Sequence, residues 1–215
     1  MSMRQMLNGF LWGILVQHQE TMFANSQNTK GRLLMESKNI SGLILASGGS
    51  RRMGRDKALL MHNEQSFLQL AKAQLAAAGC QDIYVNDANN LADLIADLGP
   101  LGGIYTALIS HPDAEFWLIL PIDMPLLTSE ILTILQAGLL DADMVRFEGE
   151  MFPLLLKSSP QMRAHITALA TDKTRTYSMR QFMQPFNINV LPLPLSSEGA
   201  FANINSPGDY ESLCI

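Results

Sequence analysis

The chain has 215 residues, of which 47% are hydrophobic and only 16% are charged, so it can build one ordinary core and does not resemble a disordered chain. Its net charge of −5 argues against a general nucleic-acid-binding surface. The two cysteines, Cys80 and Cys214, lack the spacing of a zinc site or a disulfide framework, which fits a protein of the reducing cytoplasm.

Residues 1–39 differ in character from the rest of the chain. The apolar run from Met6 to Val16 is too short to span a membrane, which needs about 20 residues, and no signal-peptide cleavage site follows it. Residues 26–38 are polar and typical of a linker, and Met35 stands just before the first predicted strand. We expect residues 1–39 to be a poorly ordered or non-native extension, and residues 40–215 to form a single domain.

From residue 40 onward, short apolar strands alternate with helices. In chain order, the first half is predicted to contain a strand at 40–46, a helix at 67–78, a strand at 82–86, a helix from 99 to about 111, a strand at 116–120 and a helix from 128 to about 137. Ser66 and Gln69 form a capping box for the first of these helices, Gly79 ends it, and Thr128 can cap the third.

The second half is less regular but keeps the same alternation. Its predicted elements are strands at 144–147 and 151–156, helices at 159–170 and 176–183, a strand at 187–191 and a terminal helix that begins at Ser206-Pro207. Continuous apolar strands that alternate with helices indicate a mostly parallel sheet with helices on both faces. The expected fold is therefore a single-domain, three-layer α/β fold.

A loop rich in glycine and basic residues follows the first predicted strand, from Leu45 to Lys57. Ligands of open α/β sheets bind at this end of a strand, where glycine N–H groups approach phosphate oxygens and basic side chains balance their charge. Gly49 and Gly54 have P-loop spacing, but Arg55-Asp56 replaces the required Lys-Ser/Thr, and the chain has no G-x-G-x-x-G. The alternative interpretation is a flexible Gly/Ser connection.

Two more motifs follow later strands. Asp123, in Pro121-Ile122-Asp123-Met124-Pro125, comes directly after a buried strand. Such a residue is more often a helix cap, but beside a phosphate-type loop it suits Mg²⁺, which takes one or two carboxylates plus substrate phosphates. The glycines of Gly99-Pro100-Leu101-Gly102-Gly103 can admit a sugar or a base edge close to the backbone, although a plain tight turn is equally consistent with them.

Together, these motifs resemble those of the molybdenum cofactor guanylyltransferase family, within the Rossmann-like nucleotidyltransferase superfamily, over residues 40–213. Residues 45–57 match L-A-G-G-x-S-x-R-M-G-x-D-K, residues 99–104 match G-P-L-A-G-I, residues 121–125 match P-x-D-x-P, and residues 201–207 are similar to F-x-N-x-N-T-P. The chain departs from the family at Ser47, which replaces the first glycine of the pair, and in the short segment from Asn86 to Gly99.

The resemblance implies Mg²⁺-dependent transfer of GMP from GTP to molybdopterin-bound molybdenum cofactor, with release of pyrophosphate. By motif position, the residues implied to hold the nucleotide are Leu45, Ala46, Ser47, Gly48, Asn86 and Gly99. Lys57 and Arg52 would bind phosphates and act in catalysis together with Asp123, which would also contact the nucleotide and carry the metal. The family's acidic residue before G-P-L corresponds to Asp93 or Asp97, of which we favour Asp93.

The resemblance also implies partners: a molybdenum-insertion protein, a small GTP-binding adaptor and the apo-enzymes that receive the cofactor, but neither nucleic acid nor membrane. Two alternatives stay open, a cytidylyltransferase or other nucleotidyltransferase of the superfamily, and a catalytically silent nucleotide-binding relative. The Gly-Pro-Leu-Gly-Gly run and the Phe-Ala-Asn-Ile-Asn tail favour the guanylyl family over the cytidylyl one. Lys57 and Asp123 argue against a silent relative, because binding alone needs no metal carboxylate.

Overall fold

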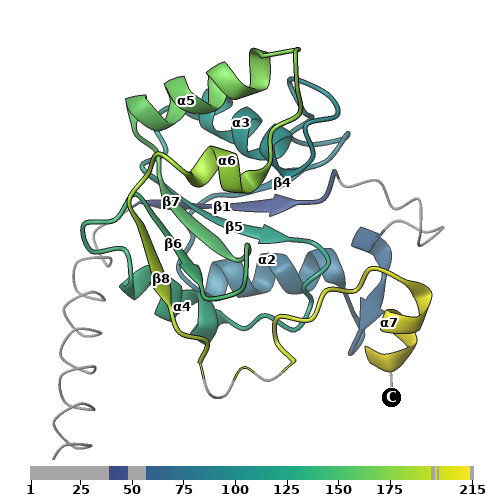
Figure 1. Ribbon diagram of the computed structural model, residues 1–215. Coiled ribbons are helices and arrows are strands. Elements are labelled where there is room, and N and C mark those ends of the chain that lie inside the picture. Colours follow the sequence, from purple (N-terminus) through teal and green to yellow (C-terminus); the bar gives the residue numbers. More distant parts are fainter. Residues whose placement is uncertain (1–38, 48–56, 195–196, 198, 214–215) are drawn as a thin grey trace, which may run out of the picture.

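The computed structural model describes residues 39–47, 57–194, 197 and 199–213. At its centre is a six-stranded sheet with the strand order β4-β1-β5-β7-β6-β8 (Figure 1). The strands are β1 (Ile40–Leu45), β4 (Ile83–Asn86), β5 (Phe116–Pro121), β6 (Met144–Phe147), β7 (Leu154–Lys157) and β8 (Ile188–Leu191). The strands pair in parallel except for β7, which is antiparallel to both of its neighbours. The prediction of a mostly parallel sheet is confirmed.

Helices cover both faces of this sheet (Figure 1). One face carries α2 (Phe67–Ala77) and α4 (Ser129–Ala137), and the other carries α3 (Pro100–Ser110), α5 (Pro160–Thr171) and α6 (Met179–Met183). Successive residues of β1 point to opposite faces, so Ile44 joins the core with α2 and α4, whereas Leu43 joins the core with α3, α5 and α6. The three-layer arrangement expected from the sequence is therefore confirmed.

A short hairpin that the sequence did not predict precedes α2. It consists of β2 (Met61–His62) and β3 (Gln65–Ser66), and it follows a 3₁₀ turn, η2 (Lys57–Leu59). Asn63 and Glu64 form its two-residue turn with φ angles of 47° and 66°, a geometry that matches the twist of the two strands. The Tyr210 hydroxyl of α7 (Pro207–Leu213) donates to the Met61 carbonyl at 2.8 Å, which joins the last described helix to this hairpin.

Local capping decides where two of the helices begin. The Ser66 hydroxyl accepts from the Gln69 N–H at 3.1 Å, and Gln69 Oε1 accepts from the Ser66 N–H at 2.8 Å, so the capping box predicted for α2 is confirmed. Ser178 and Gln181 form a second capping box, and α6 begins directly after Ser178. The prediction of a helix from residue 176 is therefore wrong at its start.

Other predicted boundaries also need correction. The strand predicted at 151–156 begins only at Leu154, because Pro153 has no N–H to donate to a strand ladder. Thr128 is at the N-cap of α4, but its side chain makes no capping hydrogen bond. Residues 87–99 contain no helix or strand before α3 begins, so the short segment noted in the sequence is an irregular connection.

The predicted extension at residues 1–39 lies outside the described residues, apart from residue 39, so its order and origin stay predictions. Among the helices that the structure describes, none is long and apolar enough to cross a membrane.

Cys80 is expected to be chemically inert in the folded protein. It follows α2, only 8% of its surface is exposed, and burial raises the pKa of its thiol to about 12. At about pH 8 the reactive thiolate is therefore almost absent. Iodoacetamide treatment followed by peptide mass spectrometry should show an unmodified Cys80 in native buffer and complete labelling in denaturing urea. Native labelling as fast as that of free glutathione would contradict this burial.

Candidate active site

The motif-bearing segments meet at the carboxyl edge of the sheet. Leu45, the last residue of β1, pairs with Asn86 at the end of β4 and with Pro121 at the end of β5. Beyond the strands, the Ala46 N–H donates to the Asn86 carbonyl and the Ile122 N–H donates to the Leu45 carbonyl, each at 3.0 Å. The loops that leave these three strands therefore start side by side, as ligand-binding loops of open α/β sheets do.

Asn86 is the buried centre of one half of this edge. Its side chain has no exposed surface, and each polar atom of its amide has a partner. Oδ1 accepts from the Ser47 hydroxyl at 2.7 Å, and Nδ2 donates to the Leu91 carbonyl at 2.9 Å and to Asp93 Oδ1 at 2.7 Å. A buried amide is stable only when it is hydrogen-bonded in this way. Asn86 thus fixes the start of the first loop and the acidic residue Asp93 with respect to each other.

Ser47, the residue that departs from the family pattern, has a structural use here. Its hydroxyl is the donor to Asn86, and a glycine at this position would leave Asn86 Oδ1 without that bond. Ala46 and Ser47 are only partly buried or exposed, whereas Leu45 packs into the core with 9% of its surface exposed. Leu45 can therefore reach a ligand only through its backbone.

The glycines at the start of α3 allow the helix to approach Asn86 closely. A Cβ on Gly103 would lie 2.4 Å from Asn86 Oδ1 and 2.6 Å from Leu45 Cδ2. A Cβ on Gly102 would lie 3.3 Å from the Asp93 carboxylate. The sequence suggested that these glycines admit a sugar or a base edge, but the nearest neighbour of Gly103 is Asn86. Gly99, the N-cap of α3, has φ +57°, which glycine adopts without strain.

The other half of the edge gathers Lys57, Asp123 and Asn205. Lys57 Nζ donates to Asp123 Oδ2 at 3.1 Å and to Asn205 Oδ1 at 2.8 Å. The side chains of Lys57 and Asp123 are only 14% and 21% exposed, so their attraction is less screened than that of a surface pair. The ammonium group can bind phosphate oxygens, and the carboxylate and amide oxygens beside it can bind a hard cation, so this cluster can hold both kinds of ligand at one place.

The tail that follows β8 places Asn205 in this cluster. The Ile204 N–H donates to the Asp123 carbonyl at 2.8 Å, and the Ile204 side chain is buried. The Asp209 carboxylate accepts from the backbone N–H groups of Asn205 and Ser206 at 2.9 and 2.8 Å. These hydrogen bonds, together with the nearby charge of Lys57, lower the pKa of Asp209. The sequence had shown this tail as a motif, but its contact with Lys57 and Asp123 was missed.

The structure separates the two acidic candidates of the segment before α3. Asp93 is bonded to Asn86, whereas Asp97 lines a separate cavity together with Lys173. Gly48 and Arg52 lie outside the described residues, so their roles stay predictions.

The donor set at Asp123 is compatible with Mg²⁺. The described residues contain no group of three or more His, Cys, Asp or Glu side chains that could hold a metal without further ligands. A single carboxylate supplemented by substrate phosphates is, however, a common coordination for this ion. The site therefore fits a metal that arrives together with a nucleotide.

A largely parallel sheet of this kind, with a lysine, a carboxylate and an asparagine at its carboxyl edge, defines a protein of the Rossmann-like nucleotidyltransferase class. Molybdopterin-guanine dinucleotide biosynthesis protein A from Archaeoglobus fulgidus has the same fold, with a TM-score of 0.58, 15% identity, and coverage of 80% of this chain and 96% of that chain. A Mycobacterium tuberculosis protein solved in complex with manganese is similar, with a TM-score of 0.55, 16% identity, and coverage of 82% and 98%.

Sequence comparison then gives the family. Residues 42–188 match the family model of the MobA-like NTP transferase domain. The molybdenum cofactor guanylyltransferase of Xanthomonas euvesicatoria is 32% identical over 177 residues, which cover 80% of this chain and 93% of that protein. The chain belongs to the MobA-like NTP transferase family and is a nucleotidyltransferase, as the motifs predicted.

Proposed function

We propose that the protein transfers GMP from GTP to the terminal phosphate of molybdopterin-bound molybdenum cofactor and releases pyrophosphate. The observation that carries this proposal is the contact of Lys57 Nζ with both Asp123 and Asn205 at the carboxyl edge of the sheet. Nucleotidyl transfer needs positioned charge more than a covalent intermediate, and this cluster supplies it. The name of the Xanthomonas relative supports the choice of substrates.

In this proposal an oxygen of the acceptor phosphate attacks the α-phosphorus of GTP, and the bond to the pyrophosphate oxygen breaks. Lys57 exchanges the oxygens of Asp123 and Asn205 for phosphate oxygens, and Arg52 adds a second positive charge. Asp123, joined by phosphate oxygens, would hold Mg²⁺, which neutralises charge that develops on the phosphates. The complex of the Mycobacterium tuberculosis protein with manganese supports a divalent metal in this fold.

The nucleoside part would lie across β1 and β4. The backbone of Leu45, Ala46, Ser47 and Gly48 would hold it from one side, and Asn86 would keep this loop in register with Asp93, which would contact the nucleotide near Gly99. The acceptor would then approach from the side of Asn205. We further propose that the acceptor is exchanged in the cytoplasm with a molybdenum-insertion protein, a small GTP-binding adaptor and apo-molybdoenzymes.

Calorimetric titration with GTP, CTP and ATP, with and without Mg²⁺, tests this proposal. We expect binding that prefers GTP, requires Mg²⁺, and is weakened about tenfold or more by Lys57→Ala and by Asp123→Ala. Lys157→Ala and Asp113→Ala are matched controls, because both residues are exposed and lie at the opposite edge, near Phe116 at the start of β5. Preference for CTP would indicate a cytidylyltransferase, and failure to bind any of the three would refute the proposal.

A further inference from the structure

Ser47 places an exposed hydroxyl group between the two halves of the carboxyl edge. It is the second residue after β1, and β1 lies between β4, which ends at Asn86, and β5, which Asp123 follows. Ser47 is exposed, whereas Asn86 is fully buried. A ligand that extends from the cluster of Lys57 and Asp123 to the end of β4 therefore passes Ser47.

The hydrogen bonds of the Asn86 amide fix its orientation. Nδ2 donates to the Leu91 carbonyl at 2.9 Å and to Asp93 Oδ1 at 2.7 Å, and carbonyl and carboxylate oxygens only accept hydrogen bonds. The amide nitrogen must therefore face these two oxygens, so Asn86 Oδ1 faces Ser47 and needs a donor. Because Asn86 has no exposed surface, bulk water does not reach it to supply that donor.

The Ser47 hydroxyl supplies this donor and uses its only hydrogen to do so. It donates to Asn86 Oδ1 at 2.7 Å. A hydroxyl oxygen has two lone pairs in addition, and no residue that the structure describes donates to Ser47 Oγ. Toward a ligand, Ser47 therefore presents an acceptor and not a donor.

Asn86 itself is enclosed by its neighbours. On the side of α3, a Cβ on Gly103 would lie only 2.4 Å from Asn86 Oδ1, so the helix backbone passes directly beside this oxygen. On the side of β1, the Ser47 hydroxyl occupies it. Of the hydrogen-bonded series Ser47, Asn86 and Asp93, it is the Ser47 oxygen that extends the series toward β1.

The sugar is the part of a nucleotide that reaches this oxygen. Neighbouring strands lie about 4.8 Å apart, so β1 is halfway along the distance of about 10 Å between β5 and β4. In the proposed function the phosphates lie at Lys57 and Asp123 and the nucleoside lies across β1 and β4. The sugar joins these two parts, and its hydroxyl groups can donate hydrogen bonds.

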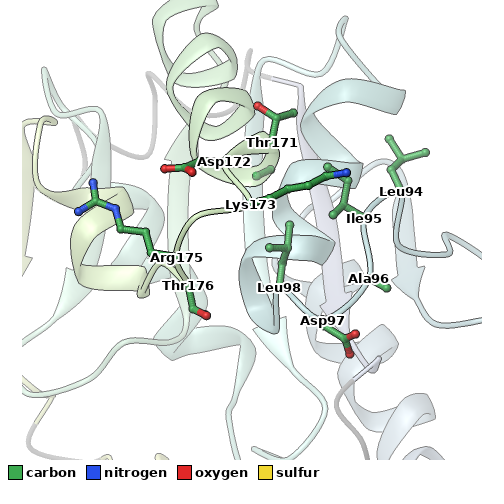
Figure 2. A pocket seen from close by; sticks show the side chains of 11 residues that line it. Leu94, Ile95, Ala96, Asp97, Leu98, Thr171, Asp172, Lys173, Arg175 and Thr176 are labelled. Atoms are coloured by element: carbon green, nitrogen blue, oxygen red, sulfur yellow. The ribbon is translucent and has the colours of Figure 1, made fainter.

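The cavity that Asp97 lines is a different place. It has a volume of about 510 Å³ and lies between residues 94–98 and residues 170–176. Figure 2 shows these two segments facing each other, with Leu98 between them. Its lining includes neither Ser47 nor Asn86. A substitution at Ser47 therefore acts on the carboxyl edge and leaves the wall of this cavity unchanged.

We propose that Ser47 Oγ accepts a hydrogen bond from a ribose hydroxyl of the nucleoside triphosphate, and that Ser47 thereby favours ribonucleotides over deoxynucleotides. This inference rests on the proposed function and adds to it a residue that determines specificity for the sugar. The family pattern has glycine at this position, and glycine has no side-chain oxygen. This means of selecting the sugar therefore comes from the residue in which the chain departs from its family.

Calorimetric titration of the full chain with GTP, 2′-deoxy-GTP and 3′-deoxy-GTP in the presence of Mg²⁺ tests the inference. The parent is expected to bind GTP about tenfold more tightly than one of the two deoxy analogues, which identifies the hydroxyl that donates. Ser47→Ala should bind GTP and that analogue equally. Loss of the donor to Asn86 weakens both ligands alike, so it cancels from the ratio of the two affinities.

Three further variants control the experiment. Ser47→Thr keeps a hydroxyl group and should keep the preference for GTP. Ser47→Gly carries the residue of the family pattern and should lose the preference as alanine does, which gives a second test if alanine disturbs folding. Ser110→Ala removes an exposed hydroxyl at the end of α3 and should keep the parent's ratio. Urea unfolding shows whether each variant is folded under the conditions of the titration.

The outcomes separate this inference from the proposed function. If the parent binds GTP and both deoxy analogues equally, or if Ser47→Ala and Ser47→Gly keep the parent's ratio, the inference is overturned. GTP binding that depends on Lys57 and Asp123 would in that case still support the proposed function. If the parent chain binds no GTP, both are overturned.

Discussion

Replacing Asp123 by asparagine is expected to lower the rate of nucleotidyl transfer by about a thousandfold. Asparagine keeps the size of the side chain and its oxygen toward Lys57, but it removes the negative charge that binds the ammonium and would hold the metal. The tail should stay in place, because Ile204 is bonded to the backbone carbonyl of residue 123 and not to its side chain. Pyrophosphate release in the presence of GTP, Mg²⁺ and molybdenum cofactor measures the effect.

The control for this experiment is Asp113→Asn, which removes a carboxylate from the exposed connection between α3 and β5. Its rate should stay within about twofold of the parent rate, as expected for a surface substitution. The assigned role of Asp123 would be wrong if Asp123→Asn also kept a rate close to that of the parent.

Gly103→Ala is expected to have the second large effect, on both stability and binding. The added methyl group would lie 2.4 Å from Asn86 Oδ1 and 2.6 Å from Leu45 Cδ2, and neither side chain can move freely because both are buried. Overpacking of this kind costs about 1–3 kcal/mol. Urea unfolding should therefore show a lower midpoint, and GTP affinity should fall because Asn86 can no longer hold Ser47 and Asp93 in position.

Gly208→Ala gives the comparison for this substitution. A Cβ on Gly208 would come no closer than 3.8 Å to the Ser206 hydroxyl, and alanine is the better helix former within α7. This variant should unfold at the parent midpoint or slightly above it. Equal midpoints and equal GTP affinities for Gly103→Ala and Gly208→Ala would show that there is room for a methyl group between residue 103 of α3 and Asn86.

The layers of the fold were predictable because each element carries its own local signal. β1 and β5 are buried along almost their whole length, and α2 begins at a capping box that four consecutive residues specify. The start of β7 was harder to predict from the sequence, because Leu154 continues an apolar run. In that run, Pro153 is the only sign that strand pairing has not yet begun. The hairpin turn at Asn63 and Glu64 contains no glycine, so the sequence lacked the usual sign of such a turn.

The candidate site was predictable only where its residues directly follow strands. Asp123 and Asn86 belong to this group, since their positions depend on strand ends alone. The contact between Lys57 and Asn205 joins residues that are 148 positions apart in the sequence, and no local pattern in the sequence can predict such a contact. The spacing of the motifs also left both Asp93 and Asp97 as candidates for the acidic residue before Gly99-Pro100-Leu101. Only the folded path of the connection between β4 and α3 distinguishes them.

The long separation between Lys57 and Asn205 has a consequence for the order in which the protein is made. A ribosome adds residues from the N-terminal end, and domains fold as their parts emerge. Lys57 and Asp123 are therefore synthesised well before Asn205, which joins them only when Ile204 has reached the backbone of Asp123. During synthesis, the chain passes through a stage in which the sheet is nearly complete but Asn205, whose Oδ1 accepts a hydrogen bond from Lys57, has not yet been made.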